Sequence, residues 1–428
     1  MSVSVCVVGL GYVGLPLALE FDGVGHRVVG YDVDQSKVDQ LRNAIDPTDE
    51  VGEDAIADST VDFTADETVV ERAEYVVVAV PTPVDELKNP DLGHVEDAGE
   101  MIGRNLSEGT TVVLESTVFP GATREIFLPA IERASGATAG EDFHVGYSPE
   151  RVVPGDDAHD FRNVVKVVGG QSEEVVTDLA ALYESVVDAG VHRAPSIEVA
   201  EATKCVENIQ RDLNIALINE MAMFCHRIGI DIHDVLEAAG TKWNFHDYRP
   251  GLVGGHCIPV DPFFVIYQSR RNGEIPKLVE NGRKVNEYVP EFVGKLTLQN
   301  LTDCGKRLRD STVLVLGLSY KPNVGDIRMS AVKGVIENLD DFDVNVVGYD
   351  PHVEPRAARE EFGIDVQEEL SFEGTDAALL ATPHDELVSI DYASVARSMA
   401  SDPVVIDVAG VLDADRLRSS DRLTFQRL

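Results

Sequence analysis

Apolar and polar positions alternate regularly over roughly the first 170 residues of the chain. Short runs of apolar, mostly β-branched residues are separated by polar stretches that are compatible with helices. This alternation predicts a parallel β-sheet with crossover helices. The runs expected to form strands are residues 3–9, 26–32, 74–80, 110–116, 143–148 and 164–169. Each run ends in Gly, Ser, Pro or Asp, which places small and polar residues at the carboxyl edge, where doubly wound sheets bind ligands.

A long helical pattern follows this region. Ser196 can cap a helix N-terminus, and no proline interrupts the pattern that continues over residues 197–230. One continuous helix of ~30 residues would be about 45 Å long, which suits a spine that joins two lobes and two subunits. A shorter second helix is predicted to end at Gly240, and the glycine-rich segment 242–262 after it is predicted to be irregular.

A second sheet pattern begins after a charged helical stretch at residues 277–304. Its expected strands are residues 312–320, 344–351, 376–383 and 403–410. The letters VCVVG and RVVGYD of the first half recur as VLVLG and NVVGYD in the second half, which predicts two similar α/β lobes. The second lobe reads GLSYKP where the first reads GLGYVG. Because it lacks the glycines that a pyrophosphate needs, we expect it to hold a different ligand.

Composition and charge restrict the class of protein. A chain of 428 residues with 44% hydrophobic and 6% aromatic residues is typical of a packed α/β enzyme of two or three domains. The 75 acidic and 36 basic residues give a formal net charge of −39. This charge makes nucleic acid and anionic membranes poor partners, and its self-repulsion requires screening by salt. We therefore expect a halophilic protein from a salt-rich cytoplasm. The stability of its folded state should rise from low to molar KCl.

The chain shows no targeting, membrane or metal signal. Its opening segment lacks a basic region and runs directly into a glycine-rich turn, which indicates a first strand rather than a signal peptide. No apolar run reaches the ~18 residues that span a membrane, so we expect a soluble, cytoplasmic protein. The five cysteines have no C-x-x-C spacing, which argues against a disulfide scaffold or a zinc site. They are Cys6, Cys205, Cys225, Cys257 and Cys304.

The motif Gly9-Leu10-Gly11-Tyr12-Val13-Gly14 carries the strongest chemical signal. It follows a strand, opens a helix and is followed by Asp32 at the end of the next strand. Gly9 permits the tight turn, Gly11 lets the backbone approach a pyrophosphate, and Gly14 lets helix and strand pack closely. Asp32 would accept hydrogen bonds from the adenosine ribose and repel a 2′-phosphate. This arrangement predicts NAD rather than NADP; the alternative is a tight turn in another doubly wound protein.

Cys257 lies in the irregular, glycine-rich segment Gly254-Gly255-His256-Cys257, four residues before Asp261. A thiolate in an exposed loop attacks carbonyl carbon, so an aldehyde made by a first oxidation could be trapped as a thiohemiacetal and oxidised again to a thioester. A lone cysteine is, by itself, more often a small buried hydrophobe. That interpretation is kept for the other cysteines predicted to lie in a strand or helix, and His256 could equally be a local hydrogen-bonding group.

Lys204 and Asn208 are spaced one turn apart on the predicted long helix. Both side chains should therefore lie on one face, where an ammonium and an amide together could stabilise an alkoxide or oxyanion. Taken alone, the pair could equally belong to a solvated helix face.

These residues, taken in order, resemble the UDP-glucose/GDP-mannose dehydrogenase family. The matching blocks are GLGYVGLPLA (9–18), VPTP (80–83), ESTVFPG (115–121), YSPERVVPG (147–155), RPGLVGGHCIPVD (249–261) and GLSYKPNVGDIR (317–328). The stretches ENIQRDLNIALINE and AAGTKWNF followed by VGGHCI look most like the branch of UDP-N-acetylglucosamine 6-dehydrogenases of capsular and O-antigen synthesis. The resemblance implies an NAD-binding Rossmann domain (1–195), a helical dimerisation domain with the cysteine loop (196–300) and a Rossmann-like UDP-binding domain (301–428).

The resemblance also implies residue roles. Cys257 would be the nucleophile, with Lys204 and Asn208 stabilising negative charge at C6 of the sugar. Asp261 would assist proton transfer or water activation, and Glu150 with Thr117 would position the hydrolytic water. The implied cofactor site comprises residues 9–14 (Gly9, Leu10, Gly11, Tyr12, Val13, Gly14), Asp32, Lys37, Pro81, Thr82, Thr117 and Arg328. The implied substrate site comprises Glu150, Arg151, Lys204, Asn208, Arg249, Gly254 and Lys321, with Arg249 reaching a neighbouring subunit.

Two positions depart from the UDP-glucose branch of the family. The lysine found there between the cysteine and the aspartate is absent, because Ile258, Pro259 and Val260 intervene. The arginine that those members use late in the C-terminal domain falls at Gly410.

The function predicted from the sequence is an NAD-dependent oxidation of a UDP-N-acetylhexosamine, UDP-N-acetylglucosamine above all, at C6 to the uronate. It would proceed through a thioester on Cys257 in a homodimer. A UDP-glucose or UDP-N-acetylmannosamine dehydrogenase of the same mechanism is the first alternative. A non-catalytic NAD-binding protein is the second.

Overall fold

The computed structural model describes residues 2–48, 50–152 and 160–428, so the end of the YSPERVVPG block lies outside the described residues. The chain divides into two compact units, and each is described by itself. The first unit is Met1–Glu207 with Phe263–Ile275, and the second is Asn208–Pro262 with Pro276–Leu428. The predicted division into three domains at residues 195 and 300 stays a prediction.

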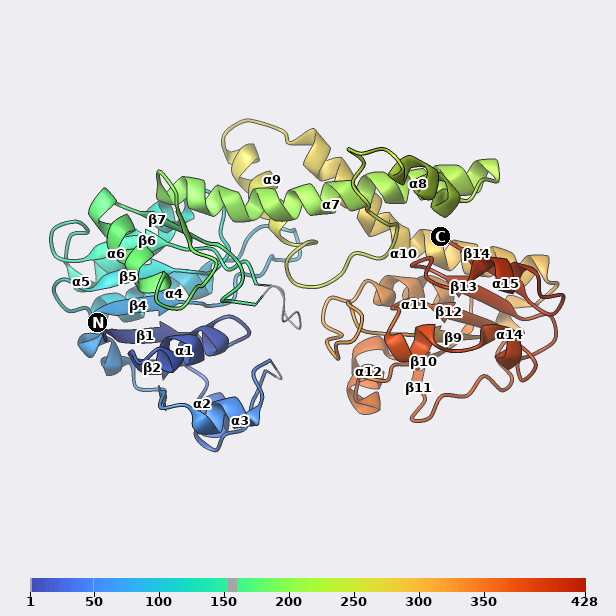
Figure 1. Cartoon of the computed structure of the whole chain (residues 1–428), viewed down its shortest axis with the longest axis horizontal. Coiled ribbons are helices and arrows are strands. Elements are labelled where there is room, and N and C mark those ends of the chain that lie inside the picture. The colour runs from blue at the N-terminus through green and yellow to red at the C-terminus, as the bar shows by residue number, and fades with distance from the viewer. Residues whose placement is uncertain (1, 49, 153–159) are drawn as a thin grey trace. The chain divides into compact units, whose positions relative to one another are not determined.

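The first unit contains an eight-stranded sheet in the order β3-β2-β1-β4-β5-β6-β7-β8 (Figure 1). Its strands are β1 (Ser4–Val8), β2 (Arg27–Tyr31), β3 (Asp62–Thr64), β4 (Tyr75–Val78), β5 (Thr111–Leu114), β6 (His144–Tyr147), β7 (Lys166–Gly170) and β8 (Val191–Arg193). Its helices include α1 (Gly14–Gly23), α2 (Gln35–Arg42), α3 (Glu53–Asp58), α4 (Gly93–Arg104), α5 (Leu128–Ser135) and α6 (Glu173–Tyr183). The predicted strands are therefore present, each shorter than its apolar run because the run includes turn residues.

One strand runs against the predicted direction. Strand β7 pairs antiparallel with β6, whereas the other pairings of this sheet are parallel. A parallel neighbour requires a crossover that returns the chain to the other end of the sheet. The segment between Tyr147 and Lys166 contains no helix among its described residues, so the chain enters β7 from the end at which β6 stops. The expectation of a wholly parallel sheet was wrong at β7, and β8, which pairs parallel with β7, shares its reversed direction.

The second unit contains a six-stranded parallel sheet in the order β11-β10-β9-β12-β13-β14 (orange to red in Figure 1). Its strands are β9 (Thr312–Leu316), β10 (Asn345–Tyr349), β11 (Asp365–Val366), β12 (Ala377–Leu380), β13 (Val404–Asp407) and β14 (Thr424–Arg427). Its helices are α8 (Ile232–Gly240), α10 (Lys277–Asp303), α11 (Val332–Asp340), α12 (Pro355–Phe362), α13 (Asp385–Val388), α14 (Tyr392–Val395) and α15 (Ala414–Arg418). Strands β3, β8, β11 and β14 escaped prediction because each is short and carries polar residues.

Strand periodicity explains how the second sheet buries both faces. Along β9, Val313 and Val315 belong to one core with residues of α10 and α11. The intervening Leu314 and Leu316 belong to a separate core on the other face. Because successive side chains of a strand point to opposite faces, a continuous apolar run is what a sheet covered on both sides requires.

Helix α7 (Ile197–Ile228) is a single helix of 32 residues, about 48 Å long at 1.5 Å per residue (green in Figure 1). Its N-terminus begins as predicted, with the Ser196 hydroxyl accepting a hydrogen bond from Val199 N at 3.3 Å. Helix α7 contributes residues to both units, and α9 (Asp261–Arg271) follows the cysteine loop. Among the described residues, no helix is both long and apolar enough to cross a membrane.

Candidate functional site

The glycine turn of the first unit follows β1 and opens α1. Gly9 has φ +91°, and a Cβ there would lie 2.6 Å from Ala79 O, so only glycine fits between β1 and the end of β4. A Cβ on Gly14 would lie 1.8 Å from Gly9 O, which explains how α1 packs so closely on the turn. A Cβ on Gly11 would meet nothing within 4 Å. The backbone at Gly11 therefore faces open space, as a turn that receives a pyrophosphate must.

Asp32 closes the site at the end of β2. Its buried carboxylate accepts hydrogen bonds from Leu10 N at 2.9 Å and Asp34 N at 3.0 Å, and it forms an ion pair with Lys37 at 2.8 Å. The carboxylate thus ties the glycine turn to β2, and α1 has no acidic residue in its first turn to oppose a phosphate. The turn, the open face at Gly11 and this fixed acid fit NAD.

Three more residues of the predicted cofactor site, Pro81, Thr82 and Thr117, lie at the same edge of the sheet. Pro81 and Thr82 follow β4, the neighbour of β1, at the point where the strand order reverses. Thr117 follows β5, and Ser116 Oγ donates to Val80 O at 2.7 Å, which joins the two loops. Ligands of doubly wound sheets bind at such a reversal point. Leu10 is buried, whereas Tyr12 is exposed.

Glu150, the predicted water-positioning residue, follows β6 and is held from both oxygens. Its Oε1 accepts hydrogen bonds from Arg151 N at 2.7 Å and Val152 N at 2.6 Å, and its Oε2 lies 3.6 Å from Lys166 Nζ. Lys166 is buried and bonds the fully buried Glu115 at 2.7 Å, and Glu115 also accepts a hydrogen bond from the Tyr183 hydroxyl. Burial raises the pKa of Glu115, and the Lys166 ammonium opposes the rise.

Two further predicted residues of the first unit differ in their surroundings. Lys204 is buried on α7. The guanidinium of Arg151 pairs with both oxygens of Glu207, at 2.6 and 3.1 Å, and donates to Val165 O. This pairing engages Arg151 with the protein itself, and its role in binding substrate stays a prediction.

Cys257 lies in the second unit and is exposed. Its carbonyl accepts hydrogen bonds from Val260 N at 3.0 Å and Asp261 N at 2.8 Å, so the loop turns directly into α9. Asp261 is buried and accepts a hydrogen bond from the Asn208 amide of α7. The structure thus brings Asn208, Asp261 and the backbone of Cys257 together. Cys6, Cys205 and Cys225 are buried, as expected, and burial raises the pKa of Cys6 to about 12.

Charged residues of the loops near His256 and of the segment before the cysteine loop are paired with one another. Arg328 forms a two-point ion pair with Asp326, at 2.9 and 2.8 Å. Burial and then the charge of Arg328 lower the pKa of His256, and Asp326, 3.9 Å from its ring, opposes this shift. Arg249 is paired with Asp247 at 2.8 Å.

The turn after β9 repeats the geometry of the glycine turn with different side chains. Gly317 has φ +80°, and a Cβ there would lie 2.2 Å from Thr382 O. A Cβ on Gly9 would likewise lie too close to Ala79 O. Asp350, at the end of β10, accepts hydrogen bonds from Leu318 N at 2.7 Å and Ser319 N at 3.0 Å, as Asp32 does from Leu10. Ser319 stands where the first turn has Gly11. The side chain at this position supports the expectation of a different ligand.

A cavity of about 210 Å³ opens beside this turn, at the carboxyl ends of β9, β12 and β13. Strand order reverses between β9 and β12, so the cavity occupies the position in the second sheet that the glycine turn occupies in the first. It is lined by residues of three loops, namely 251–254 with Gly254, 319–322 and 381–383, together with 330–332, Val408 and Ala409. Lys321 lies on the turn between two lining residues, Tyr320 and Pro322.

Gly410 lacks room for the arginine of the UDP-glucose branch. A Cβ there would lie 1.9 Å from the His233 ring, and Gly410 has φ +66°. His233 is buried and bonds Leu428 O at 3.0 Å. Any larger residue at position 410 would require His233 to move, so this position does not accommodate an arginine side chain.

Sequence reasoning missed two buried networks beside these sites. One joins Glu115, Lys166 and Tyr183, and the other joins Asp350 to His384. The second had a signal, because the end of β12 reads ATPH where the end of β4 reads AVPT, and Asp350 repeats Asp32. Charged residues within apolar runs were the signal for the first.

The fold and the glycine turn define a two-lobed dinucleotide-binding protein of the Rossmann class. Models of the UDP-glucose/GDP-mannose dehydrogenase family match its NAD binding domain at residues 3–187, its central domain at 198–288 and its UDP binding domain at 314–414. The chain therefore belongs to the UDP-glucose/GDP-mannose dehydrogenase family. The predicted fold class and the predicted family are both confirmed.

Similar proteins cover almost the whole chain. The protein CapL of Staphylococcus aureus is 41% identical over 99% of both chains. A UDP-N-acetyl-D-glucosamine 6-dehydrogenase of Pseudomonas aeruginosa is 40% identical over 97% of this chain and 98% of its own. The solved structure of a UDP-D-ManNAc dehydrogenase from Pyrococcus horikoshii has a TM-score of 0.90 at 28% identity, over 99% of this chain and 98% of its own. The chain is an NAD-dependent dehydrogenase of sugar nucleotides, and NAD is its cofactor.

Proposed function

We propose that the protein oxidises the C6 hydroxymethyl of a UDP-N-acetylhexosamine, UDP-N-acetylglucosamine above all, to a carboxylate through a thioester on Cys257. The observation that carries the proposal is the exposed thiol of Cys257 in a glycine-rich loop. This loop leads directly to Asp261, which accepts a hydrogen bond from the Asn208 amide. The choice of sugar is supported by the 40% identity to a UDP-N-acetyl-D-glucosamine 6-dehydrogenase, against 30% to the UDP-N-acetyl-D-mannosamine dehydrogenase of Pyrococcus horikoshii.

Four electrons leave one carbon in this reaction, as two hydrides. NAD, when bound, accepts one hydride in each oxidation. The first oxidation removes a hydride from C6 and a proton from its hydroxyl, giving an aldehyde. The Cys257 thiolate adds to this carbonyl, and the resulting thiohemiacetal loses a second hydride and a proton to give the thioester. Water then cleaves the carbon–sulfur bond, releasing the carboxylate and the thiol. Covalent attachment keeps the aldehyde from leaving between the two oxidations.

We assign complementary roles to the predicted catalytic residues. Lys204 and Asn208, one turn apart on α7, stabilise the negative charge that develops on the C6 oxygen. Asp261 orients the Asn208 amide and assists proton transfer. Glu150 positions the hydrolytic water with Thr117, and the Lys166 ammonium 3.6 Å away holds the Glu150 carboxylate in place. Lys321 and Arg249 contact the substrate, Arg249 from a neighbouring subunit, and Arg328 lies near the cofactor.

Replacing the thiol tests the covalent step. Cys257→Ser is expected to bind UDP and NAD as the wild type does and to form no uronate, because an alcohol at this position is a far weaker nucleophile than a thiolate. Cys304→Ser is the control, since Cys304 is a partly exposed cysteine of the same unit, 3.3 Å from the Thr424 hydroxyl. Full uronate production by Cys257→Ser would refute the thioester.

A substrate panel tests the sugar. NADH absorbance would be followed in molar KCl with UDP-GlcNAc, UDP-GalNAc, UDP-ManNAc, UDP-glucose and GDP-mannose. The expected result is the highest kcat/KM for UDP-GlcNAc, with two NADH formed per uronate. A preference for UDP-glucose or UDP-ManNAc would leave the mechanism intact and overturn the choice of sugar.

We also propose a homodimer that pairs through α7. Leu217, Met221, Phe224 and Ile228 recur at helical spacing and are exposed along this helix. A water-exposed apolar stripe of this length marks an interaction surface, and a second copy of the chain presents a self-complementary one. Phe224→Glu is expected to give a monomer by light scattering, while a wild type that is itself monomeric would exclude the dimer. The net charge supports a salt-rich cytoplasm as the setting.

A further inference from the structure

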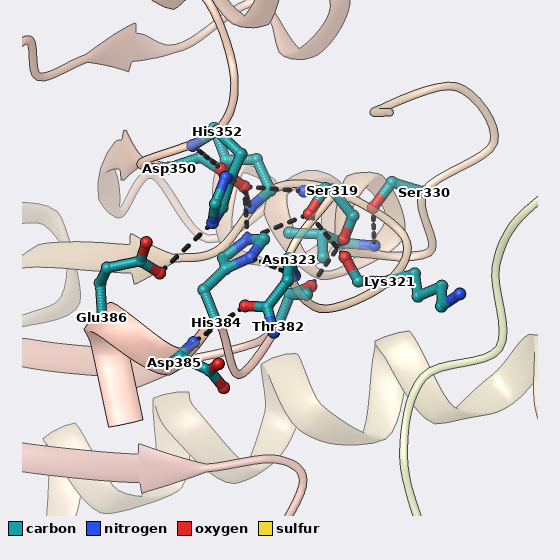
Figure 2. Close-up of polar contacts among 12 residues, drawn as sticks. Ser319, Lys321, Asn323, Ser330, Asp350, His352, Thr382, His384, Asp385 and Glu386 are labelled. Carbon is teal, nitrogen blue, oxygen red and sulfur yellow. Dashed lines mark hydrogen bonds and ion pairs between the residues drawn. The ribbon is translucent and has the colours of Figure 1, made fainter. Parts of the chain in front are cut away.

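His384 lies at the centre of a buried polar network in the second unit (Figure 2). It is fully buried at the end of the loop after β12 and precedes α13. Its Nε2 lies 3.0 Å from Asp350 Oδ2 and 3.0 Å from Ser319 Oγ, and its Nδ1 accepts a hydrogen bond from Asn323 N at 2.8 Å. The ring therefore connects three segments that are far apart in the sequence.

These contacts determine which nitrogen of His384 carries the proton. A backbone N–H can only donate, so Nδ1 must present its lone pair to Asn323. Nε2 then carries the proton and donates it toward Asp350 and Ser319. Burial opposes ionisation of Asp350, but the hydrogen bonds from His384, His352 and Leu318 lower the pKa of this carboxyl below its ordinary value. An ionised Asp350 keeps the proton on Nε2 and leaves Nδ1 available to Asn323.

The turn that His384 holds is conformationally demanding. Asn323 has φ +60°, a left-handed conformation that costs most residues about 1–2 kcal/mol. Its side chain accepts a hydrogen bond from Asp385 N at 3.0 Å, so the loop after β12 grips Asn323 at both its backbone and its side chain. The Ser319 hydroxyl donates to Lys321 O at 3.1 Å, and Thr382 donates to Ser319 O at 2.6 Å. These hydrogen bonds together hold the turn over residues 319–323 in one conformation.

The first unit has a different residue at the equivalent position. Ala79 N bonds Val8 O and Ala381 N bonds Leu316 O, which aligns the end of β4 with the end of β12. In this alignment His384 corresponds to Thr82, a predicted cofactor residue. Ser319 likewise corresponds to Gly11, which faces open space. In the second lobe, the side chains of Ser319 and His384 therefore occupy positions where the first lobe has Gly11 and Thr82. Both side chains form hydrogen bonds that hold the turn.

We propose that His384 is a positioning residue for substrate, whose Nδ1 holds the turn over residues 319–323 in the shape that receives the UDP moiety. Tyr320 and Pro322 of this turn line the 210 Å³ cavity, together with Thr382 of the loop that carries His384. In Figure 2 the Lys321 side chain extends away from the His384 ring. His384 touches no substrate itself; it removes the entropic cost of ordering Lys321 and its neighbours upon binding.

This inference rests on the proposed function, because it takes the second-lobe cavity as the UDP site. The inference predicts that UDP binding depends more on the hydrogen-bond acceptor at the Nδ1 position than on the donor at the Nε2 position. His384→Asn places its amide oxygen near the position of Nδ1 and can still accept from Asn323. His384→Gln places its amide near the position of Nε2 and retains the bond to Asp350 while losing the one to Asn323.

UDP binding to the full-length protein, measured by calorimetry, separates these variants. His384→Gln is expected to raise the Kd for UDP and the KM for the UDP-sugar about tenfold with kcat nearly unchanged, the effect of losing one buried hydrogen bond. His384→Asn is expected to remain within about threefold of the wild type. His352→Asn is the matched control, because the His352 ring lies 4.8 Å from that of His384 but bonds the exposed Glu386. It should bind UDP normally.

A variant on the exposed side of the turn covers the case in which a substitution at the buried histidine prevents folding. Asn323→Gly keeps the left-handed backbone, removes the bond to Asp385 and frees the turn, so it should also weaken UDP binding several-fold. NAD affinity, which belongs to the first unit, should not change in any variant. Equal UDP binding by wild type, His384→Gln and Asn323→Gly would overturn the inference alone. A wild type that binds no UDP would overturn the proposed UDP site with it.

Discussion

Gly255→Ala is expected to disable the enzyme by moving the thiol without touching it. Gly255 lies two residues before Cys257 in the second unit and has φ +87°. A Cβ at this position would lie 2.8 Å from two carbons of the Tyr320 ring. At Gly255 itself, the backbone N donates a hydrogen bond to Met329 O at 3.1 Å.

The structure sets the size of the effect. A left-handed backbone costs an alanine about 1–2 kcal/mol, and a clash with a rigid ring adds about 1–3 kcal/mol. The hydrogen bond from Gly255 N to Met329 O contributes only about 1 kcal/mol. The strain exceeds the contribution of this bond, so the backbone at Gly255 is expected to move away from Tyr320 rather than compress against it. A displacement of about 1 Å at a reacting atom lowers the rate about 100-fold.

The assay is kcat from NADH absorbance at saturating UDP-sugar, with thermal unfolding measured in parallel. Gly240→Ala is the matched control, because Gly240 lies in the same unit, has no left-handed φ, and a Cβ there would meet nothing within 4 Å. Gly255→Ala should lose about 100-fold in kcat while its Cys257 still reacts with a thiol reagent, and Gly240→Ala should stay near the wild type. A Gly255→Ala enzyme with the wild-type kcat would refute the idea that contact with Tyr320 positions the thiol.

Three further predictions concern stability. Burial raises the pKa of Glu201 from 4.5 to about 7, so between these pH values the folded chain holds a proton that the unfolded chain releases, and stability falls as pH rises. Relative to Glu201→Gln, the wild type should lose about 3 kcal/mol of unfolding free energy from pH 4.5 to 7 in denaturant titrations, and parallel pH profiles would contradict this. Lys166→Met leaves the buried Glu115 without its cation and should cost about 3–5 kcal/mol, whereas Lys333→Met, which breaks an exposed pair with Glu361, should cost under about 1 kcal/mol. The net charge of −39 predicts a melting temperature that rises from dilute buffer to molar KCl; a maximum in dilute buffer would argue against it.

Much of the architecture was predicted from residues that lie close together in the sequence. Helix α7 was predicted because a helical pattern and a capping serine lie next to each other in the chain. The glycine turn was predicted because the backbone geometry of one strand–helix junction requires glycine at positions 9, 11 and 14. Asp32 was predicted because the next strand of the same βαβ unit ends there. The two sheets were predicted from apolar runs that are as long as buried strands.

Sequence alone determined which residues carry the chemistry that we propose, because thiol, amide and carboxylate chemistry depends on residue type. Tertiary structure alone decided which of them meet. Asn208 reaches Asp261, Lys166 reaches Glu115, and His384 reaches Asp350 only once strands and helices 34 to 53 residues apart have packed together. It also decided the reversed direction of β7 and the absence of space at Gly410. Such pairings are set by the sum of many packing contacts, which no short window of sequence contains.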